Sequence, residues 1–491
     1  MRGNPDRHMR INGRHQHSSV YQSFSVVIIL CLSVILSSSC KSETSIFPSV
    51  PTNSGTAGET TLIIETIPSP NTDIPDVIRV AAPFSEETSI YLAKLYAAKK
   101  TGLIGSGITG QTVSLEYLQT IDPLFFVEHY TTSATGASFS SYKTWEEDGT
   151  IPDIIFTDSM SRMAELGLLL PLNDFLSGNP YIAPSNAYPY MTEQCTYLGK
   201  LLGIPYAASI TVLFANTEIL TAAGVELPYE VSFQDIVDAA SAVNALNTPE
   251  ILMDRHVVPI YSGSDMLPFL PASFDSTLGY MARKDDEIDT HSAGFADAMK
   301  FLRNIDPSYF VEEMSEEKIN EVFGTMNPIL AKRVAFWVGG SDEISRWANY
   351  MPYTLAITQI PSVNEGTYSP PALTVFPLCV SAFTKHPHEA SDYAAFIALD
   401  PDAIMLRIRL NDYEGFLPVV KSPDVWDYSF TNVKYTGSFY KLKDYMSDAF
   451  YCPFVSDYDF FVQTEDFLNQ YYAELINSDL PPHELIESIN D

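Results

Sequence analysis

The chain has 491 residues, 46% of them hydrophobic, so it can bury a sizeable core, and its length favours two to three domains. Acidic residues (61) far outnumber Lys and Arg (28), which gives a formal net charge of −33. An electrostatic field of this sign repels phosphate backbones and anionic lipid surfaces. The composition therefore argues against nucleic-acid binding and implies that any membrane contact is made through a discrete anchor.

The N-terminus has the pattern of an export signal. Several arginines precede an apolar stretch, residues 24–36, that is shorter than the roughly 20 residues of a membrane-spanning helix. The small residues that follow, with Cys40, resemble the lipobox of bacterial lipoproteins, although Leu36 stands one place further from the cysteine than in that family. We therefore expect residues 1–39 to be a lipoprotein signal peptide and Cys40 to carry the lipid.

Two alternatives to lipidation are a cleaved secretory signal with an incidental cysteine and an uncleaved membrane anchor. All three interpretations place the rest of the chain outside the cytoplasm. Residues 40–76 are rich in Ser, Thr and Pro, which predicts a disordered tether. The remaining cysteines, Cys195, Cys379 and Cys452, are far apart in sequence, which favours buried free thiols and leaves open one long-range disulfide.

The globular part begins with alternating strand and helix patterns. Val77–Ala82 is a β-branched run, and Ser85 is a candidate N-cap for a helix that starts at Glu86 and stops near Gly102. Two further strands are predicted at 113–118 and 153–157. Apolar strands that alternate with helices predict a parallel sheet that is covered on both faces.

Five blocks, in order, resemble the maltose-binding-protein-like extracellular solute-binding proteins of ABC transporters. The first block has a buried strand, a polar turn and a helix. The third has a strand that ends in a glycine turn. The second, fourth and fifth look like strands that cross between the lobes. The five blocks are PDIIFTDSMSRMAELGLLL (152–170), GKLLGIPYAASITVLFAN (199–216), AKRVAFWVGGSDEISRW (331–347), FPLCVSAFTKHPHEASDYAAFIAL (376–399) and GFLPVVKS (415–422).

This resemblance implies an α/β, two-lobed periplasmic-binding-protein-like fold of type II, with discontinuous lobes and a hinge of three crossings. The N-terminal lobe would comprise residues 77–208 with 380–413, and the C-terminal lobe residues 209–379 with 414–491. It also implies a monomer that captures a sugar or oligosaccharide by closing its cleft, delivers it to the permease subunits of an ABC importer, and uses no cofactor or metal. Closure over a small molecule agrees with the general rule that open α/β sheets bind ligands at the carboxyl ends of their strands.

The first group of candidate ligand contacts follows the strand at 153–157. Thr157, Asp158 and Ser159 offer a carboxylate and two hydroxyls that can bond to sugar hydroxyls. The alternative is that Asp158 and Ser159 cap the following helix. The family resemblance favours ligand contact.

The second group lies in the first crossing and in the glycine turn. Tyr206 can stack on a pyranose ring, although core packing is an equally ordinary role for tyrosine, and Ser209 aligns with a polar contact position of the family. In the turn, Gly340 permits close approach of a ligand to the backbone, and Ser341 and Asp342 follow it. An ordinary turn is the alternative, and Asp342 replaces the tryptophan that better-known sugar binders often have there.

Further candidate contacts are aromatic residues and one serine near expected strand or helix ends. They are Phe84, Ser85, Phe269, Tyr458 and Phe460. Because 12% of the chain is aromatic, chance clustering is the alternative for each of them.

Two other interpretations remain open. An extracellular glycan-active enzyme would use Asp158 and Asp342 as its carboxylate pair, and a binding protein of the same fold would take a polyamine or peptide instead of a sugar. His386 and His388 flank Pro387 but have no third metal ligand nearby in the sequence, so a solvent-facing loop is the simpler interpretation.

Overall fold

The computed structural model describes residues 75–104, 113–133, 136–228, 230–248, 256–351, 354–363, 369–410, 416–432 and 439–490. All of these residues belong to one compact unit, Ala57–Asp491. The predicted signal peptide, Cys40 and nearly all of the predicted tether lie outside the described residues. Within the described part, none of the helices has both the length and the apolar character needed to cross a membrane.

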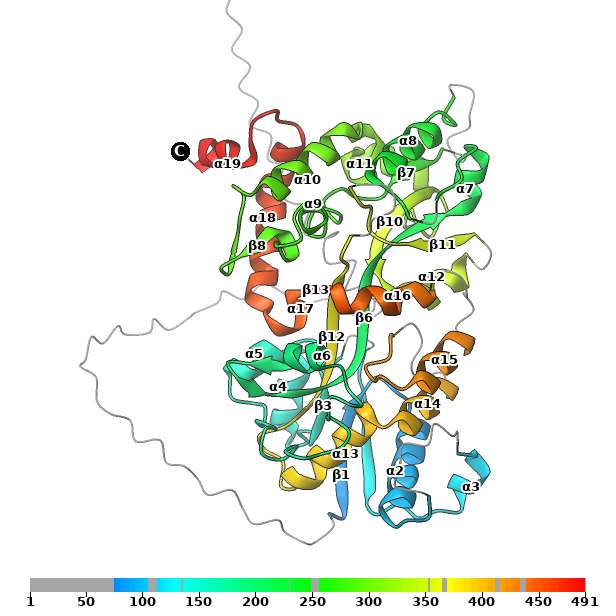
Figure 1. Ribbon diagram of the computed structural model, residues 1–491, viewed down its shortest axis with the longest axis vertical. Helices are drawn as coiled ribbons and strands as arrows, with labels where there is room; N and C mark the ends of the chain where they lie inside the picture. The colour runs from blue at the N-terminus through cyan, green and yellow to red at the C-terminus, as the bar shows by residue number, and fades with distance from the viewer. Residues whose placement is uncertain are drawn as a thin grey trace, which may run out of the picture. The chain divides into compact units, whose positions relative to one another are not determined.

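A nine-stranded sheet runs through the described residues in the order β2-β1-β3-β12-β6-β10-β7, with β11 also paired to β6 and β13 to β12. Two long strands, β6 (Gly203–Asn216) and β12 (Ala372–Val380), pair with each other and connect the two halves of the sheet (Figure 1). The other strands are β1 (Val77–Ala82), β2 (Phe126–Thr131), β3 (Ile154–Phe156), β7 (Val258–Ile260), β10 (Val334–Gly340), β11 (Leu355–Thr358) and β13 (Phe450–Tyr451). Two hairpins, β4 (Thr196–Tyr197) with β5 (Lys200–Leu201) and β8 (Arg283–Lys284) with β9 (Glu287–Ile288), stand apart from this sheet.

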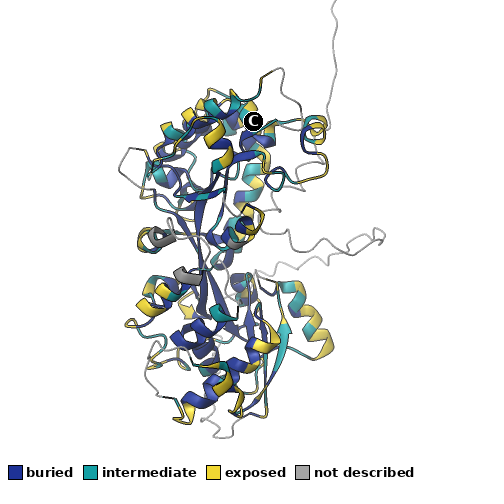
Figure 2. Cartoon of the chain, turned by 90° about the vertical axis from the view of Figure 1, so that its right-hand side faces the viewer, coloured by how far each residue is buried: buried dark blue, intermediate teal, exposed yellow. Residues whose placement is uncertain are grey.

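Helices cover both halves of the sheet. Figure 2 shows buried strands at the centre and exposed residues mainly on the outer helices. The first half carries α2 (Glu86–Lys100), α3 (Leu115–Gln119), α4 (Phe139–Asp148), α5 (Met160–Glu165), α6 (Pro189–Gln194), α13 (Pro387–Leu399), α14 (Pro401–Arg409) and α15 (Pro423–Asn432). The second half carries α7 (Thr217–Ala222), α8 (Phe233–Asn244), α9 (Pro271–Phe274), α10 (Ala293–Asn304), α11 (Glu316–Phe323), α12 (Ile344–Tyr350), α16 (Phe439–Tyr445), α17 (Pro453–Ser456), α18 (Tyr458–Ile476) and α19 (Pro482–Asn490). Short 3-10 turns lie at Tyr280–Ala282, Pro307–Tyr309, Val311–Glu313, Ser341–Glu343 and Met446–Asp448.

Local sequence accounts for the first strand and helix. The predicted strand Val77–Ala82 is confirmed as β1, and α2 starts at Glu86 because the Ser85 hydroxyl accepts a hydrogen bond from the Thr88 amide at 3.2 Å. Acidic residues in the first turn and basic residues in the last turn also oppose the charges of the helix dipole. Gly102, with a φ of 74°, follows the end of the helix.

The predicted strand at 113–118 is wrong. These residues form the short helix α3, because the Ser114 hydroxyl accepts a hydrogen bond from the Tyr117 amide at 3.1 Å and so caps a helical turn. The second strand is instead β2, which pairs in parallel with β1 along its whole length. A short apolar run does not distinguish a strand from a helix, and here the cap decided the outcome.

The crossing pattern expected from the second and fourth blocks is present in β6 and β12. In its described residues, 416–422, the fifth block pairs through isolated bridges, Leu417 with Ala208 and Val420 with Ala187. Helix α15 packs against α14, which belongs to the first half of the sheet. We therefore propose that the lobe boundary within residues 414–491 falls after α15.

Candidate functional site

The carboxyl ends of strands from the two halves of the sheet point toward each other. Strands β3 and β6 run in the same direction, because each is antiparallel to β12, whereas β10 is antiparallel to β6. In register, the end of β3 aligns with Ile204 of β6 and the end of β10 aligns with Thr211. At roughly 3.3 Å per residue the two ends stand roughly 20 Å apart along β6. The middle of β6, with Ser209, lies between them.

The turn after β3 presents one carboxylate and one hydroxyl. Thr157 is fully buried, and its hydroxyl donates to the Ala137 carbonyl at 2.7 Å and accepts from the Ser159 amide at 3.0 Å. Asp158 and Ser159 are half-buried, and the Ser159 hydroxyl donates to the Asp158 carboxylate at 2.7 Å. Thr157 therefore shapes the turn, and Asp158 and Ser159 are the groups of this turn that solvent can reach.

The helix-capping alternative for this turn does not match the geometry. Ser159 occupies the N-cap position of α5, but no side chain caps the helix there. Burial raises the pKa of Asp158, while the hydrogen bond from Ser159 opposes this rise. Asp158 is thus a partly desolvated carboxyl whose orientation is set by its neighbour.

Sequence reasoning missed the loop that covers this turn. Gly136 has a φ of 106°, and a Cβ atom there would lie 2.8 Å from Thr157 Cα. Only glycine permits this backbone to lie so close to the end of β3. In the sequence, the only local indication of this loop was Gly136, which follows the edge strand β2 by a few residues.

The aromatic candidates of the first lobe are buried. Tyr206 is fully buried, with ring centroids 5.0 Å from Phe156 and 6.5 Å from Phe84, and the Arg407 guanidinium lies 3.9 Å from its ring centroid. Phe84 is also buried and stacks on His129 at 5.4 Å. Both rings are therefore packed in the core of the first lobe, which agrees with the core alternative for Tyr206. Contact of either ring with a ligand stays a prediction. Ser85 is exposed and caps α2.

Ser209 joins the crossing strand to the glycine turn after β10. Its hydroxyl donates to the Asp342 carboxylate and lies 3.4 Å from the hydroxyl of the fully buried Ser341. The Ser341 hydroxyl in turn accepts from the Ile210 amide at 3.1 Å. These three predicted residues therefore form one polar cluster at the middle of β6. Burial raises the pKa of Asp342, opposed by the hydrogen bond from Ser209.

The two glycines of this turn make room for side chains of the chain itself. A Cβ atom on Gly340 would meet Asp342 Oδ1 and would lie 2.7 Å from Ser209 Oγ. A Cβ atom on Gly339 would meet the carboxylate of Glu343 and would lie 2.9 Å from the ring of Phe214. Gly340 therefore leaves space for the Asp342 carboxylate and Gly339 for the Glu343 carboxylate. Because neighbouring residues of a strand face opposite sides, the two carboxylates lie on opposite faces of β10.

Glu343 was not among the predicted residues. Burial and the neighbouring Asp342 raise its pKa to about 8, and Arg346, whose guanidinium lies 3.6 Å away, opposes the rise. The Glu343 side chain is only 16% exposed, and this burial favours the protonated form of the carboxyl in the folded protein. A glutamate next to a candidate aspartate after paired glycines was the only local signal.

Gly340→Ala is expected to destabilise the protein by about 1–3 kcal/mol, because the added methyl group displaces Asp342 and Ser209. The backbone at Gly340 (φ −81°) suits alanine, so the effect would come from crowding alone. Thermal unfolding measures it. Gly279→Ala is the matched control, since its Cβ would have no neighbour closer than 3.7 Å. Equal melting temperatures for the two variants would contradict the crowding.

The remaining aromatic candidates separate into two environments. Phe269 is half-buried and meets Tyr280 edge-on at 5.5 Å, Tyr280 lies 6.3 Å from Phe461, and Phe461 stacks with Tyr458 at 6.3 Å. Phe269 and Tyr458 thus belong to one aromatic row. Phe460 is buried under the Arg283 guanidinium, which lies 4.3 Å from its ring. On α18, the neighbouring Phe461 belongs to the aromatic row, and Phe460, the candidate contact, does not.

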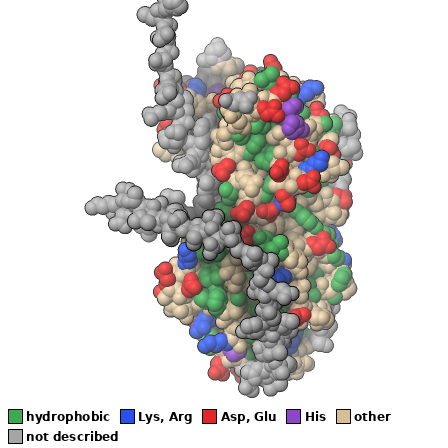
Figure 3. Space-filling model, turned by 90° about the vertical axis from the view of Figure 1, so that its left-hand side faces the viewer, with side chains coloured by type: hydrophobic (Ala, Val, Ile, Leu, Met, Phe, Trp, Pro, Cys, Tyr) green, Lys and Arg blue, Asp and Glu red, His purple; other side chains and the backbone are tan. Residues whose placement is uncertain are grey.

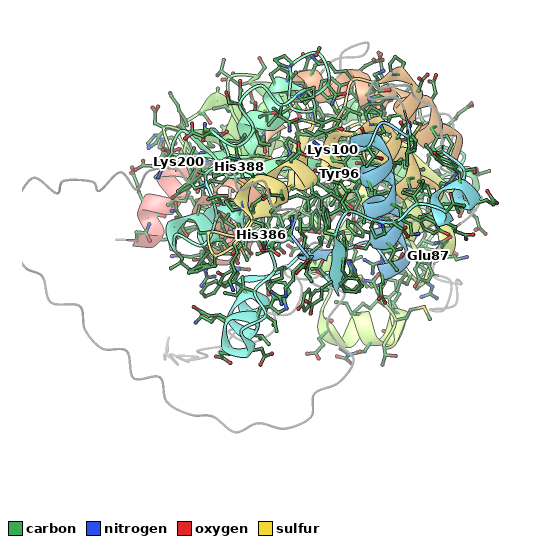
Figure 4. The ribbon with its side chains drawn as sticks, turned by 90° about the horizontal axis from the view of Figure 1, so that it is seen from below. Glu87, Tyr96, Lys100, Lys200, His386 and His388 are labelled. Carbon is green, nitrogen blue, oxygen red and sulfur yellow. The ribbon has the colours of Figure 1, made fainter. Side chains whose placement is uncertain are left out.

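The cysteines and histidines do not form a further reactive site among the described residues. Cys195, Cys379 and Cys452 are free and buried. Within the described ranges, no group of three or more His, Cys, Asp or Glu residues has the arrangement of a metal site. His386 and His388 lie at the start of α13 (Figure 4), where His388 contacts Phe175 edge-on at 4.8 Å.

Two α/β lobes, joined by long crossing strands and with strand ends that face each other, define a two-lobed binding protein of the type II periplasmic class. A family model described as bacterial extracellular solute-binding protein matches residues 127–428, and the chain belongs to this family. No curated protein matches the chain in sequence.

Solved structures of the same architecture are similar along most of the chain. An ABC substrate-binding protein from Listeria monocytogenes, in complex with cycloalternan, has 17% identity and a TM-score of 0.59, over 84% of this chain and 96% of that one. A sugar transporter protein from Rhizobium etli, in an open conformation, has 13% identity and a TM-score of 0.58, over 84% and 97%. The GacH receptor of Streptomyces glaucescens, whose structures include acarbose complexes, has 16% identity and a TM-score of 0.54, over 83% and 95%. These similarities establish the fold.

Proposed function

We propose that this protein captures a sugar or oligosaccharide outside the cytoplasm and delivers it to the permease of an ABC importer. The observation that carries the proposal is the polar cluster of Ser209, Ser341 and Asp342 at the middle of β6, between strand ends that face each other. Hydroxyl and carboxylate groups there can replace water around sugar hydroxyls, and the row from Phe269 to Tyr458 offers ring faces for C–H groups.

Membership of the solute-binding family and the names of similar structures support the same function. Those structures include complexes with cycloalternan, mannobiose and acarbose. Asp158 would contribute from the first lobe, and Asp342 with Ser209 from the second lobe and the crossing. Capture would depend on closure, because only a ligand that interacts more favourably with the closed form can shift the population toward it.

Attachment to the membrane belongs to the same proposal. Lipid on Cys40 would hold the protein at the outer face of the cell membrane, with residues 40–76 as the tether. Acidic side chains are spread over the upper part of the face in Figure 3, as expected from the net charge of −33. Such a surface favours a soluble monomer and disfavours direct adsorption to anionic lipid.

Thermal-shift screening of the purified protein tests the ligand class. The panel would contain cycloalternan, acarbose, mannobiose and common mono- and disaccharides, together with polyamines and short peptides. A sugar that binds the native state is expected to stabilise it by about 3 kcal/mol at 100 times its Kd. A rise in melting temperature with a polyamine or peptide, but with no sugar, would overturn the sugar proposal. Release of a hydrolysis product from an oligosaccharide of the panel would overturn the role as a binding protein without enzymatic activity.

Asp158→Asn and Asp342→Asn are each expected to weaken binding of the sugar by about ten-fold or more, because each removes a charged acceptor at a half-buried position. Calorimetric titration measures the affinity. Asp424→Asn, at an exposed position on α15, makes the same change of charge and should leave affinity unchanged. Equal affinity in all three variants would remove both aspartates from the proposed site.

A further inference from the structure

A hydrogen bond joins the first lobe to the helix that carries the Tyr458 ring. The Ser161 hydroxyl accepts it from the Tyr458 backbone amide at 3.2 Å, across a sequence separation of 297 residues. Ser161 is 3% exposed and lies in α5, directly after the turn that holds Asp158 and Ser159. Tyr458 is the first residue of α18. The bond therefore links two groups of candidate ligand contacts that come from different parts of the chain.

The Tyr458 amide needs an acceptor from outside its own helix. The first amides of an α-helix have no intrahelical partner, and leaving one buried without an acceptor is costly. The cap of α18 is already engaged, because the Asp457 carboxylate accepts from the Phe460 amide at 3.2 Å. Ser161 supplies an acceptor for the next orphan amide.

The start of α18 is held firmly on the second lobe. Arg283 pairs with the Asp457 carboxylate, and its guanidinium also covers the ring of Phe460. Helix α17, which precedes α18, packs against α5. The Ser161–Tyr458 bond therefore lies within a wider contact between α5 and the α17–α18 segment, and it can form only in lobe arrangements that keep α5 beside the start of α18.

We propose that Ser161 is a positioning residue that couples the two lobes: its bond to Tyr458 favours the lobe arrangement in which Asp158 and the Tyr458 ring contact one ligand. This inference rests on the proposed function. Ser161 does not itself have to touch the ligand. Its effect is on the relative population of lobe arrangements, and therefore on affinity.

The test compares Ser161→Ala with Ser391→Ala. Ser391 is also a fully buried helical serine, but its hydroxyl donates to the Pro387 carbonyl of its own helix at 2.6 Å. In the ligand-free protein, Ser161→Ala is expected to speed hydrogen exchange of the Tyr458 amide by about ten-fold and to broaden the interlobe distance distribution from two fluorescent labels. Ser391→Ala should change neither. Unchanged exchange and distances in Ser161→Ala would overturn the proposal.

The affinity arm uses the panel sugar that most stabilises the unaltered protein. Ser161→Ala is expected to weaken its binding by about five-fold, and Ser161→Thr, which keeps the hydroxyl, to restore it within about two-fold. A Ser161→Ala protein that bound equally or more tightly would overturn the proposal. If no sugar bound even the unaltered protein, the proposed function would fail, and the ligand-free measurements would still decide whether Ser161 couples the lobes.

Discussion

Lys99→Met is expected to lower the free energy of unfolding by about 3–5 kcal/mol, because it leaves two carboxylates buried without their cation. The Lys99 ammonium lies 2.8 Å from carboxylate oxygens of both Asp400 and Asp402, and the three side chains are 5%, 1% and 1% exposed. Burial opposes the charge on Lys99, but the two carboxylates outweigh it and raise its pKa. The ion pairs join α2 to the start of α14, where Asp400 also accepts from the Asp402 and Ala403 amides.

Lys100→Met is the matched control from the same helix. Lys100 pairs with Asp392 at 2.6 Å, but its side chain is 44% exposed, and pairs of this kind contribute about 0–1 kcal/mol. Tyr96 and Lys100 lie near one end of α2 and Glu87 lies near the other (Figure 4). Denaturant unfolding of both variants gives the comparison. A similar loss of stability in Lys99→Met and Lys100→Met would show that burial does not set the cost.

The protein is expected to be more stable near pH 5 than near pH 8. Burial is the largest cause that raises the pKa of Asp265 and of Glu343 to about 8, and of Glu465 to about 7. In each case the folded state keeps a proton that the unfolded chain loses above its ordinary pKa of 3.8 or 4.5. Stability therefore falls as the pH rises from the unfolded to the folded pKa. Burial lowers the pKa of His256, so this group makes the protein more stable as the pH rises. Its contribution is expected to be smaller than the combined contribution of the three carboxyls.

Glu343→Gln tests this pH dependence most directly. The amide cannot ionise, so the melting temperature of this variant should fall less between pH 5 and pH 8 than that of the unaltered protein. Between pH 5 and pH 8, the free energy of unfolding of the unaltered protein should fall by on the order of 1–3 kcal/mol more than that of Glu343→Gln. Glu317→Gln, at an exposed position on α11, should leave the profile unchanged. Parallel profiles for Glu343→Gln and the unaltered protein would contradict a raised pKa at Glu343.

Local signals in the sequence predicted the elements whose cause is local. The strand Val77–Ala82 and the start of α2 at Glu86 agree with the structure because β-branched residues and a serine cap act within a few residues. The cluster of Ser209, Ser341 and Asp342 joins residues that the sequence had selected separately. The strand predicted at 113–118 was wrong because a serine cap competed with a short apolar run.

Contacts between distant segments could not be predicted in this way. The Arg407 guanidinium covers the ring of Tyr206, and Ser161 bonds to Tyr458, although neither partner carries a local signal for the other. On α18, Phe460 and Phe461 are adjacent and chemically identical, and only the packing of Arg283 against Phe460 separates their roles.

Caps and β-branched runs in the sequence were enough to predict β1 and the start of α2, because these signals act over short distances. The crossing strands were expected from the resemblance of five sequence blocks to a known family, and so were most of the candidate polar and aromatic groups. Only the tertiary structure decided which of these groups are buried, which carboxyls share a desolvated turn, and which hydrogen bond ties the lobes together. Burial and electrostatic environment depend on segments that are hundreds of residues apart in sequence, and these segments come together only when the sheet has formed.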